Sequence, residues 1–226
     1  TPSSTTMVAW QWKANGGTTT TNDSSSTGVG NVDSIYQANT TAGFSIVTFP
    51  SDNTAGRTVA HGLGAAPTCI ITKGRAQTSS WYTYHKEAGA NKWLTLNSTN
   101  AAATNTGIWG NTHPTSSIFT IGNNETGYNN GGANESIAYC FAPIQGYSKF
   151  GSYTGNKRDT INPTQIALFA NTNGADDTDK KVDFLSNGFK LRNSRDDFNT
   201  DGVTYIYMAF AESPFVSSEG VPTTAR

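Results

Sequence analysis

Short apolar segments separated by clusters of glycine, asparagine and proline recur along the chain, and this spacing limits what the chain can fold into. Alternating segments of this length predict half-buried strands, and no long segment has the apolar spacing of an amphipathic helix. Strands at intervals of roughly ten to twenty residues favour an all-β fold, a β-sandwich or jelly roll, over alternating strands and helices. The expected strands are Phe44–Phe49, Thr58–Val59, Thr68–Lys73, Trp81–His85, Lys92–Leu96, Ile118–Ile121 and Ser136–Phe141.

The composition indicates a folded β protein and not a disordered chain. Hydrophobic residues make up 35% of the 226 residues and charged residues 14%, yet eleven Phe, nine Tyr and five Trp supply ample material for a core. With a net charge of −1, the chain offers no basic stripe for phosphates, so we expect no nucleic-acid partner. No apolar run is long enough to cross a bilayer, so we expect no membrane insertion.

An internal repeat indicates two related antiparallel units. The segments Phe119–Asn123, Tyr128–Gly132 and Ile137–Ala142 match Phe189–Asn193, Phe198–Gly202 and Ile206–Ala211 in order and in approximate spacing, and Gly43-Phe44-Ser45 matches Gly146-Tyr147-Ser148. We therefore predict a first β unit at 43–145 and a second at 146–215, each ending in a hairpin whose last strand ends in Phe-Ala. The second unit is shorter, with no counterpart of the segment around His61–His85.

Outside the two units, the sequence predicts less structure. Residues 1–42 are expected to form an N-terminal strand around Met7–Trp12 followed by a polar linker or surface loop, and residues 216–226 a C-terminal tail. Cys69 and Cys140 each lie in an apolar segment, which favours two buried free thiols over a disulfide.

Two aromatic segments are candidate contact sites. In the strand Trp81–His85, Trp81 and His85 share one face while Tyr82 and Tyr84 share the other. One face is expected in the core, and the other could present aromatic rings to a sugar. The loop around Trp109 and His113 is the second candidate, because loops framed by glycine and proline often carry recognition residues. Packing in the core is the alternative interpretation of both segments.

The remaining polar motifs predict no catalytic chemistry. His61, in a His-Gly-Leu-Gly segment, is interpreted as a turn residue. Asp197–Gly202 imitates the first half of a calcium loop, but Met208 stands where a glutamate ligand is needed, so we predict a turn there. No nucleophile elbow, metalloprotease helix or phosphate-binding loop is present. We therefore expect no catalytic residues, no metal and no cofactor, and we interpret the chain as a non-enzyme.

Several motifs together resemble a known family. The segment Met7–Gly17, which reads MVAWQWKANGG, resembles the first segment of a β-rich domain of uncharacterised function that is common in marine and cyanobacterial tailed-phage genomes. The other matching segments are Ala42–Val47, His61–Pro67, Trp81–Lys86, Phe141–Asn156, Leu185–Arg192 and Tyr205–Glu212. The resemblance covers nearly the whole chain.

This resemblance implies a virion protein that folds in the host cytoplasm and is released by lysis. The family often lies at the C-terminal end of long virion-associated proteins, and a chain that begins at Thr1 fits such an end piece. The resemblance implies no more than a virion location, and our first hypothesis for the function is host attachment as a tail fibre or receptor-binding module. The alternatives are a head decoration or head-fibre protein bound to the capsid, and a glycan-degrading tailspike, which would need two suitably placed carboxylates. The partners that we expect are other virion proteins, further copies of the chain in a homotrimer, and a host surface glycan.

Overall fold

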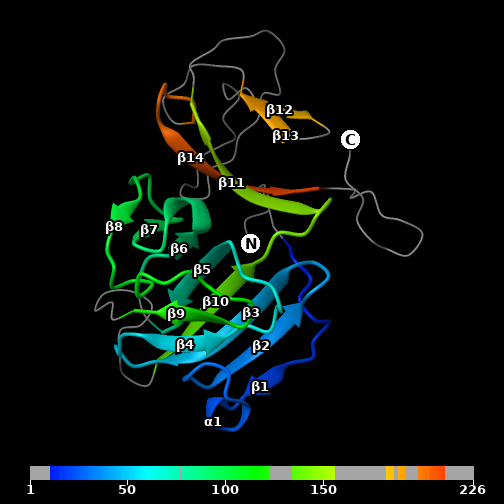
Figure 1. The fold of residues 1–226 in the computed structure, drawn as a ribbon, viewed down its shortest axis with the longest axis vertical. Helices are drawn as coiled ribbons and strands as arrows, with labels where there is room; N and C mark the ends of the chain where they lie inside the picture. Colours follow the sequence, from blue (N-terminus) through cyan, green and yellow to red (C-terminus); the bar gives the residue numbers. More distant parts are fainter. Residues whose placement is uncertain are drawn as a thin grey trace, which may run out of the picture.

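An eight-stranded antiparallel sheet forms the centre of the fold, in the order β1-β2-β3-β10-β5-β6-β7-β8 (Figure 1). The computed structural model describes residues 11–76, 78–122, 134–155, 182–185, 188–191 and 198–211. The strands of the large sheet are β1 (Thr20–Asn22), β2 (Ser34–Asn39), β3 (Phe44–Ser51), β5 (Cys69–Gly74), β6 (Tyr82–His85), β7 (Lys92–Thr95), β8 (Ala103–Thr104) and β10 (Asn134–Phe141). The all-β prediction is confirmed, and the seven strands expected between Phe44 and Phe141 are present within a few residues of their expected bounds.

A two-stranded sheet covers one face of the large sheet. It consists of β4 (Arg57–Ala60) and β9 (Ile118–Ile121), which Figure 1 shows alongside β3 and β10. Val59 and Phe119 are at most 1% exposed and pack in one cluster with Val47 and Phe49 of β3. The rings of Phe49 and Phe119 meet edge to face, with centroids 5.8 Å apart. The two sheets bury these apolar side chains between them and so form the two layers of a sandwich.

A second two-stranded sheet covers part of the opposite face. It consists of β11 (Ser148–Thr154) and β14 (Thr204–Phe210), which lie at one end of the large sheet in Figure 1. Phe150 and Phe210 pack against Phe44 and Phe141 of the large sheet. Trp12 lies against the same group, with its ring centroid 5.8 Å from that of Phe210.

The second unit repeats the arrangement of the first. β10 pairs with β3, and its repeat counterpart β14 pairs with β11. A covering pair also recurs, because β12 (Val182–Leu185) pairs with β13 (Gly188–Leu191) as β4 pairs with β9. Phe189 meets Tyr153 edge to face at 5.5 Å, as Phe119 meets Phe49 at 5.8 Å. The two related antiparallel units predicted from the sequence are therefore present.

The predicted hairpins are wrong. In the described residues β9 pairs with β4, and β10 lies between β3 and β5, so β9 and β10 do not form a hairpin. The same holds for their counterparts, because β13 pairs with β12 and β14 with β11. A strand has only two edges, and those of β10 are already occupied by non-adjacent strands.

The N-terminal region is also more structured than predicted. Residues expected to form a polar linker include β1, β2 and the short helix α1 (Ser24–Thr27), which the side chain of Asp23 caps. Met7–Trp10 lies outside the described residues, and Gln11 and Trp12 are not in a strand. Hydroxyl and carboxylate side chains stabilise this turn-rich segment by satisfying backbone N–H groups.

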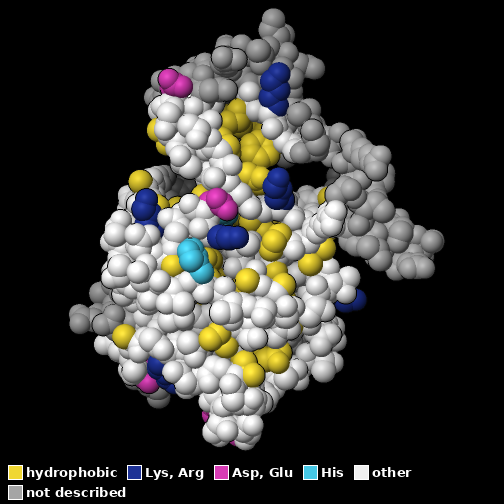
Figure 2. All heavy atoms as spheres, viewed as in Figure 1, with side chains coloured by type: hydrophobic (Ala, Val, Ile, Leu, Met, Phe, Trp, Pro, Cys, Tyr) yellow, Lys and Arg dark blue, Asp and Glu magenta, His cyan; other side chains and the backbone are white. Residues whose placement is uncertain are grey.

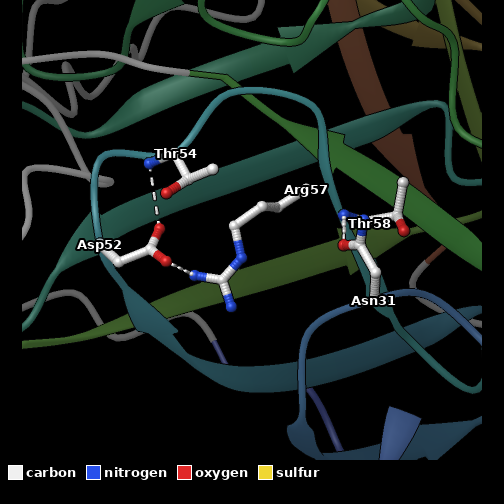
Figure 3. Close-up of polar contacts among 5 residues, drawn as sticks. All are labelled: Asn31, Asp52, Thr54, Arg57 and Thr58. Atoms are coloured by element: carbon white, nitrogen blue, oxygen red, sulfur yellow. Dashed lines mark hydrogen bonds and ion pairs between the residues drawn. The ribbon is translucent and has the colours of Figure 1, made fainter. Parts of the chain in front are cut away.

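Polar contacts also hold the connection between β3 and β4 (Figure 3). Asp52 accepts a hydrogen bond from the Thr54 N–H (3.0 Å) and forms an ion pair with Arg57. At the start of β4, the side-chain oxygen of Asn31 accepts a hydrogen bond from the Thr58 N–H (2.7 Å). These contacts fix the position of the covering strand over the sheet.

The two cysteines are buried free thiols, as predicted. Cys69 packs in the cluster with Phe141, whereas Cys140 packs in the cluster with Val47. The two thiols therefore point to opposite faces of the sheet and cannot form a disulfide with each other. Burial raises the pKa of Cys69 to about 12 and also raises that of Cys140, so neither is a reactive thiolate at neutral pH.

Candidate functional site

The face of the large sheet that carries β11 and β14 is only partly covered, and its exposure changes row by row. Residues directly opposite one another on neighbouring antiparallel strands point to the same face. The first such row runs through His85, Cys69, Phe141 and Phe44. All four side chains are at most 3% exposed, because the β11–β14 sheet and Trp12 lie over this end.

The second row is mostly half-exposed. It runs through Thr83, Ile71, Tyr139, Ile46 and Gln37. Only Thr83 is buried, and the other four side chains keep intermediate exposure. This row therefore marks the boundary of the covering sheet.

The third row is the most exposed. It runs through Lys73, Ile137, Thr48, Ile35 and Thr21, and Ile35 is 44% exposed. We call the second and third rows, with Trp81 and Leu96 at their edge, the open face. Contiguous exposed apolar side chains on a folded domain mark interaction surfaces more often than single ones do.

Trp81 and Tyr139 form an aromatic pair on the open face. Their ring centroids are 6.2 Å apart and their planes make an angle of 32°. By alternation along the strand, the Trp81 side chain points to the same face as that of Thr83. The Leu96 N–H donates a hydrogen bond to the carbonyl oxygen of Trp81 (3.0 Å). Leu96 is itself 42% exposed. Aromatic rings with one face open can pack on apolar surface while their polar edges hydrogen-bond.

A lysine lies beside this pair. The ammonium of Lys73 is 5.6 Å from the centroid of the Trp81 ring, within the range of a cation–π interaction. It donates a hydrogen bond to the carbonyl oxygen of Ser79 (2.6 Å). These two contacts hold a positive charge at the edge of the aromatic pair.

A shallow cavity lies at the opposite end of the open face. Its volume is about 230 Å³. It is lined by Thr21, Asp33, Ser34, Ile35, Thr48, Phe49, Pro50 and Glu135. Asp33 accepts hydrogen bonds from the backbone and hydroxyl of Ser24, and Glu135 pairs with Arg75, so both carboxylates already have partners.

The candidate residues on the strand 81–85 divide between surface and core. Trp81 lies on the open face at intermediate exposure. Tyr82 (6% exposed) and Tyr84 (1% exposed) point to the other face, into the cluster covered by β4 and β9, so they form no aromatic platform. His85 is 1% exposed in the first row. Both faces of the strand are covered at its His85 end, which the alternating pattern alone could not indicate.

The two candidate segments meet at Tyr84. Trp109 is buried and meets the Tyr84 ring edge to face at 5.8 Å. His113 is exposed, and its Nδ1 lies 2.7 Å from the hydroxyl of Tyr84. Trp109 therefore anchors its loop in the core, which leaves His113 as the accessible member of this group.

His61 and His85 are buried neutral histidines. The Nδ1 atom of His61 accepts a hydrogen bond from the Leu63 N–H (3.2 Å), and its Nε2 atom lies 3.2 Å from the carbonyl oxygen of Thr115. Burial lowers the pKa of His61 to about 4, although the Thr115 carbonyl acts in the opposite direction. Burial likewise lowers the pKa of His85. The predicted turn role of His61 is confirmed by its bond to the Leu63 N–H.

The sequence did not single out Tyr139, Lys73 or Ile137 as surface residues. Alternation in Ser136–Phe141 shows which residues share a face, but not which face is covered. The open face arises because β10 pairs with β3 and β5, from segments far away in the sequence. Only knowledge of that register brings Tyr139 next to Trp81.

On the side of the molecule drawn in Figure 2, charged side chains are few and scattered, and hydrophobic side chains are exposed in several groups. Within the described residues, no three His, Cys, Asp or Glu side chains are grouped to hold a metal ion. In the same part of the chain, no helix is long and apolar enough to cross a membrane.

Comparison with known proteins gives one family. A family model described as a domain of unknown function (DUF7483) matches residues 1–159 and 156–214. No curated protein and no solved structure matches the chain.

Proposed function

This chain belongs to the DUF7483 family, and we propose that it is a surface module of a tailed-phage particle that contacts the host. The motif resemblance seen in the sequence supports a virion protein. The open face carries the proposal of contact, because it combines exposed apolar side chains with an aromatic pair and a fixed cation. The β11–β14 sheet leaves that face uncovered, although it buries the first row completely.

We propose a tail-fibre or receptor-binding role in preference to a catalytic one. Two of the three histidines, His61 and His85, are buried and neutral. The third, His113, is exposed and hydrogen-bonded to Tyr84. Both cysteines are buried. A binding module needs only a surface of suitable shape and chemistry, and the open face supplies one.

Labelling of intact particles tests this proposal. Antibody fragments raised against the purified chain would be imaged on particles of a phage that encodes it. We expect labels at the tail tip and, with the fragments bound, a loss of adsorption to host cells. Labels arrayed over the head would instead assign the chain to capsid decoration, and unlabelled particles would remove it from the virion.

The homotrimer expected from the sequence is part of the same proposal. The edges of the large sheet are the short strands β1 and β8, of three and two residues, and short edge strands already limit edge-to-edge pairing. A trimer would therefore depend on contacts between faces and not between strand edges. Sedimentation equilibrium of the purified chain gives the number of copies directly.

A further inference from the structure

We propose that the open face binds an anionic saccharide, with a sugar ring on Trp81 and Tyr139 and the acidic group of the sugar at Lys73. This inference rests on the proposed attachment function, since it names the ligand of the same face. Its basis is the geometry of these three residues and the ammonium of Lys73, which has no carboxylate partner among the described residues.

The aromatic pair provides the apolar half of such a site. The Trp81 and Tyr139 rings lie 6.2 Å apart at 32° and keep intermediate exposure on a face that also carries isoleucine and threonine side chains. A sugar ring, with one face of C–H groups, can pack there while its hydroxyls stay hydrated or bonded.

The charged half is Lys73. In the described residues its ammonium has no carboxylate partner, because the two ion pairs there are Asp52–Arg57 and Arg75–Glu135. Its one hydrogen bond goes to the Ser79 carbonyl, and a lysine ammonium has three donors. A carboxylate or sulfate placed beside Trp81 would therefore meet a positive charge with free donors.

Two matched pairs of saccharides test the inference by calorimetric titration of the whole chain. The first pair is oligogalacturonate and its methyl ester, which differ in charge but not in the ring. The second pair is dextran sulfate and dextran. We expect at least one anionic member to bind tenfold or more tightly than its neutral partner in low salt, and this difference to shrink in 0.5 M NaCl. Which pair shows the effect distinguishes a carboxylate from a sulfate.

Variants assign the binding to the open face. Lys73→Gln should reduce the anionic ligand to the affinity of its neutral partner, whereas Trp81→Ala should weaken both by at least tenfold. Lys149→Gln removes an exposed lysine from β11, away from this face, and should change nothing. Trp81→Phe keeps a ring and controls for a loss of folding in Trp81→Ala.

Two results would overturn the inference. One is that the wild type binds the charged and the neutral member of each pair equally. The other is that it binds none of the four saccharides at a ligand concentration of about 10 mM. If particles were still labelled and adsorption still blocked, the attachment function would stand without this ligand. If an anionic saccharide bound through Lys73 but particles were unlabelled, the virion proposal alone would fail.

Discussion

At the scale of single residues, the turn at His61–Gly64 shows how local chemistry supports the sandwich. His61 accepts a hydrogen bond from the Leu63 N–H, and Gly62 has a φ of +72°, a left-handed conformation that favours glycine. A Cβ atom at Gly62 would lie 2.1 Å from the ring of Tyr36. Gly64 has a φ of +69° with open space around it. The two glycines thus have similar backbone conformations, but only Gly62 lacks the space for a side chain.

We predict that Gly62→Ala destabilises the fold more than Gly64→Ala. The strain of the left-handed conformation costs roughly 1–2 kcal/mol at either position. At Gly62 the clash with Tyr36 adds about 1–3 kcal/mol. Chemical denaturation of both variants measures the difference, and equal losses of stability would show that Tyr36 moves aside freely.

Buried histidine predicts a dependence of stability on pH. The pKa of His61 is about 4 in the folded chain and about 6.5 when unfolded, so the unfolded state binds the proton more readily. The stability from neutral His61 is complete above pH 6.5 and decreases as the pH falls, by roughly 3 kcal/mol at pH 4. The lowered pKa of His85 acts in the same direction.

Urea denaturation between pH 7 and pH 4.5 measures this loss. The variant His61→Gln, which has no titrating ring, should show a shallower decrease than the wild type even if its stability at pH 7 is lower. Parallel curves for the two proteins would mean that His61 is not the group responsible.

At the scale of elements, the two covering pairs should differ in stability. Phe119 of β9 is 1% exposed, whereas its counterpart Phe189 of β13 is half-buried. Truncation of a fully buried Phe costs about 3–5 kcal/mol, and a partly exposed one costs less. Phe119→Ala should therefore weaken the whole first unit, and Phe189→Ala mainly the second.

Hydrogen exchange followed by mass spectrometry checks this expectation. In Phe189→Ala, the amides of β11 and β14 should exchange faster while those of β3 and β10 stay protected. Faster exchange in all four strands at once would mean that the two units unfold as one.

Most strands between Phe44 and Phe141 could be predicted from sequence, whereas β1, β2 and the pairing of the strands could not. Alternation and turn residues located β3, β5, β6, β9 and β10 because these signals are local. The repeat indicated that β9 and β10 form a hairpin, yet each pairs with a strand from elsewhere. The partner of a strand is decided by burial of both its faces, and the sequence of one segment does not contain that information.

For the same reason, only part of the candidate site could be predicted from the sequence. Trp81 was correctly grouped with the face of Thr83 and His85, but Tyr82 and Tyr84 were equally plausible as a platform. Tyr139 was missed because only the β10–β5–β6 register places it beside Trp81. A sequence shows which residues share a face, whereas the covering layer decides which face remains open.

At the scale of the whole molecule, the two related units are stacked unequally. The β11–β14 sheet of the second unit buries the first row of the large sheet and leaves the second row, apart from Thr83, half-exposed and the third row more exposed. Unequal stacking therefore creates the open face, and the proposed attachment function requires that this face contacts a partner.

Binding of the labelled chain to host cells tests that claim most directly. The wild type, Trp81→Ala and Ile137→Lys would be compared by flow cytometry, with Val203→Ser as the control, since Val203 is exposed (42%) near the start of β14 and off the open face. We predict that the two open-face variants lose most of the cell binding while the control keeps it. If the folded variants Trp81→Ala and Ile137→Lys bound cells as well as the wild type does, the proposal that the open face contacts the host would be contradicted.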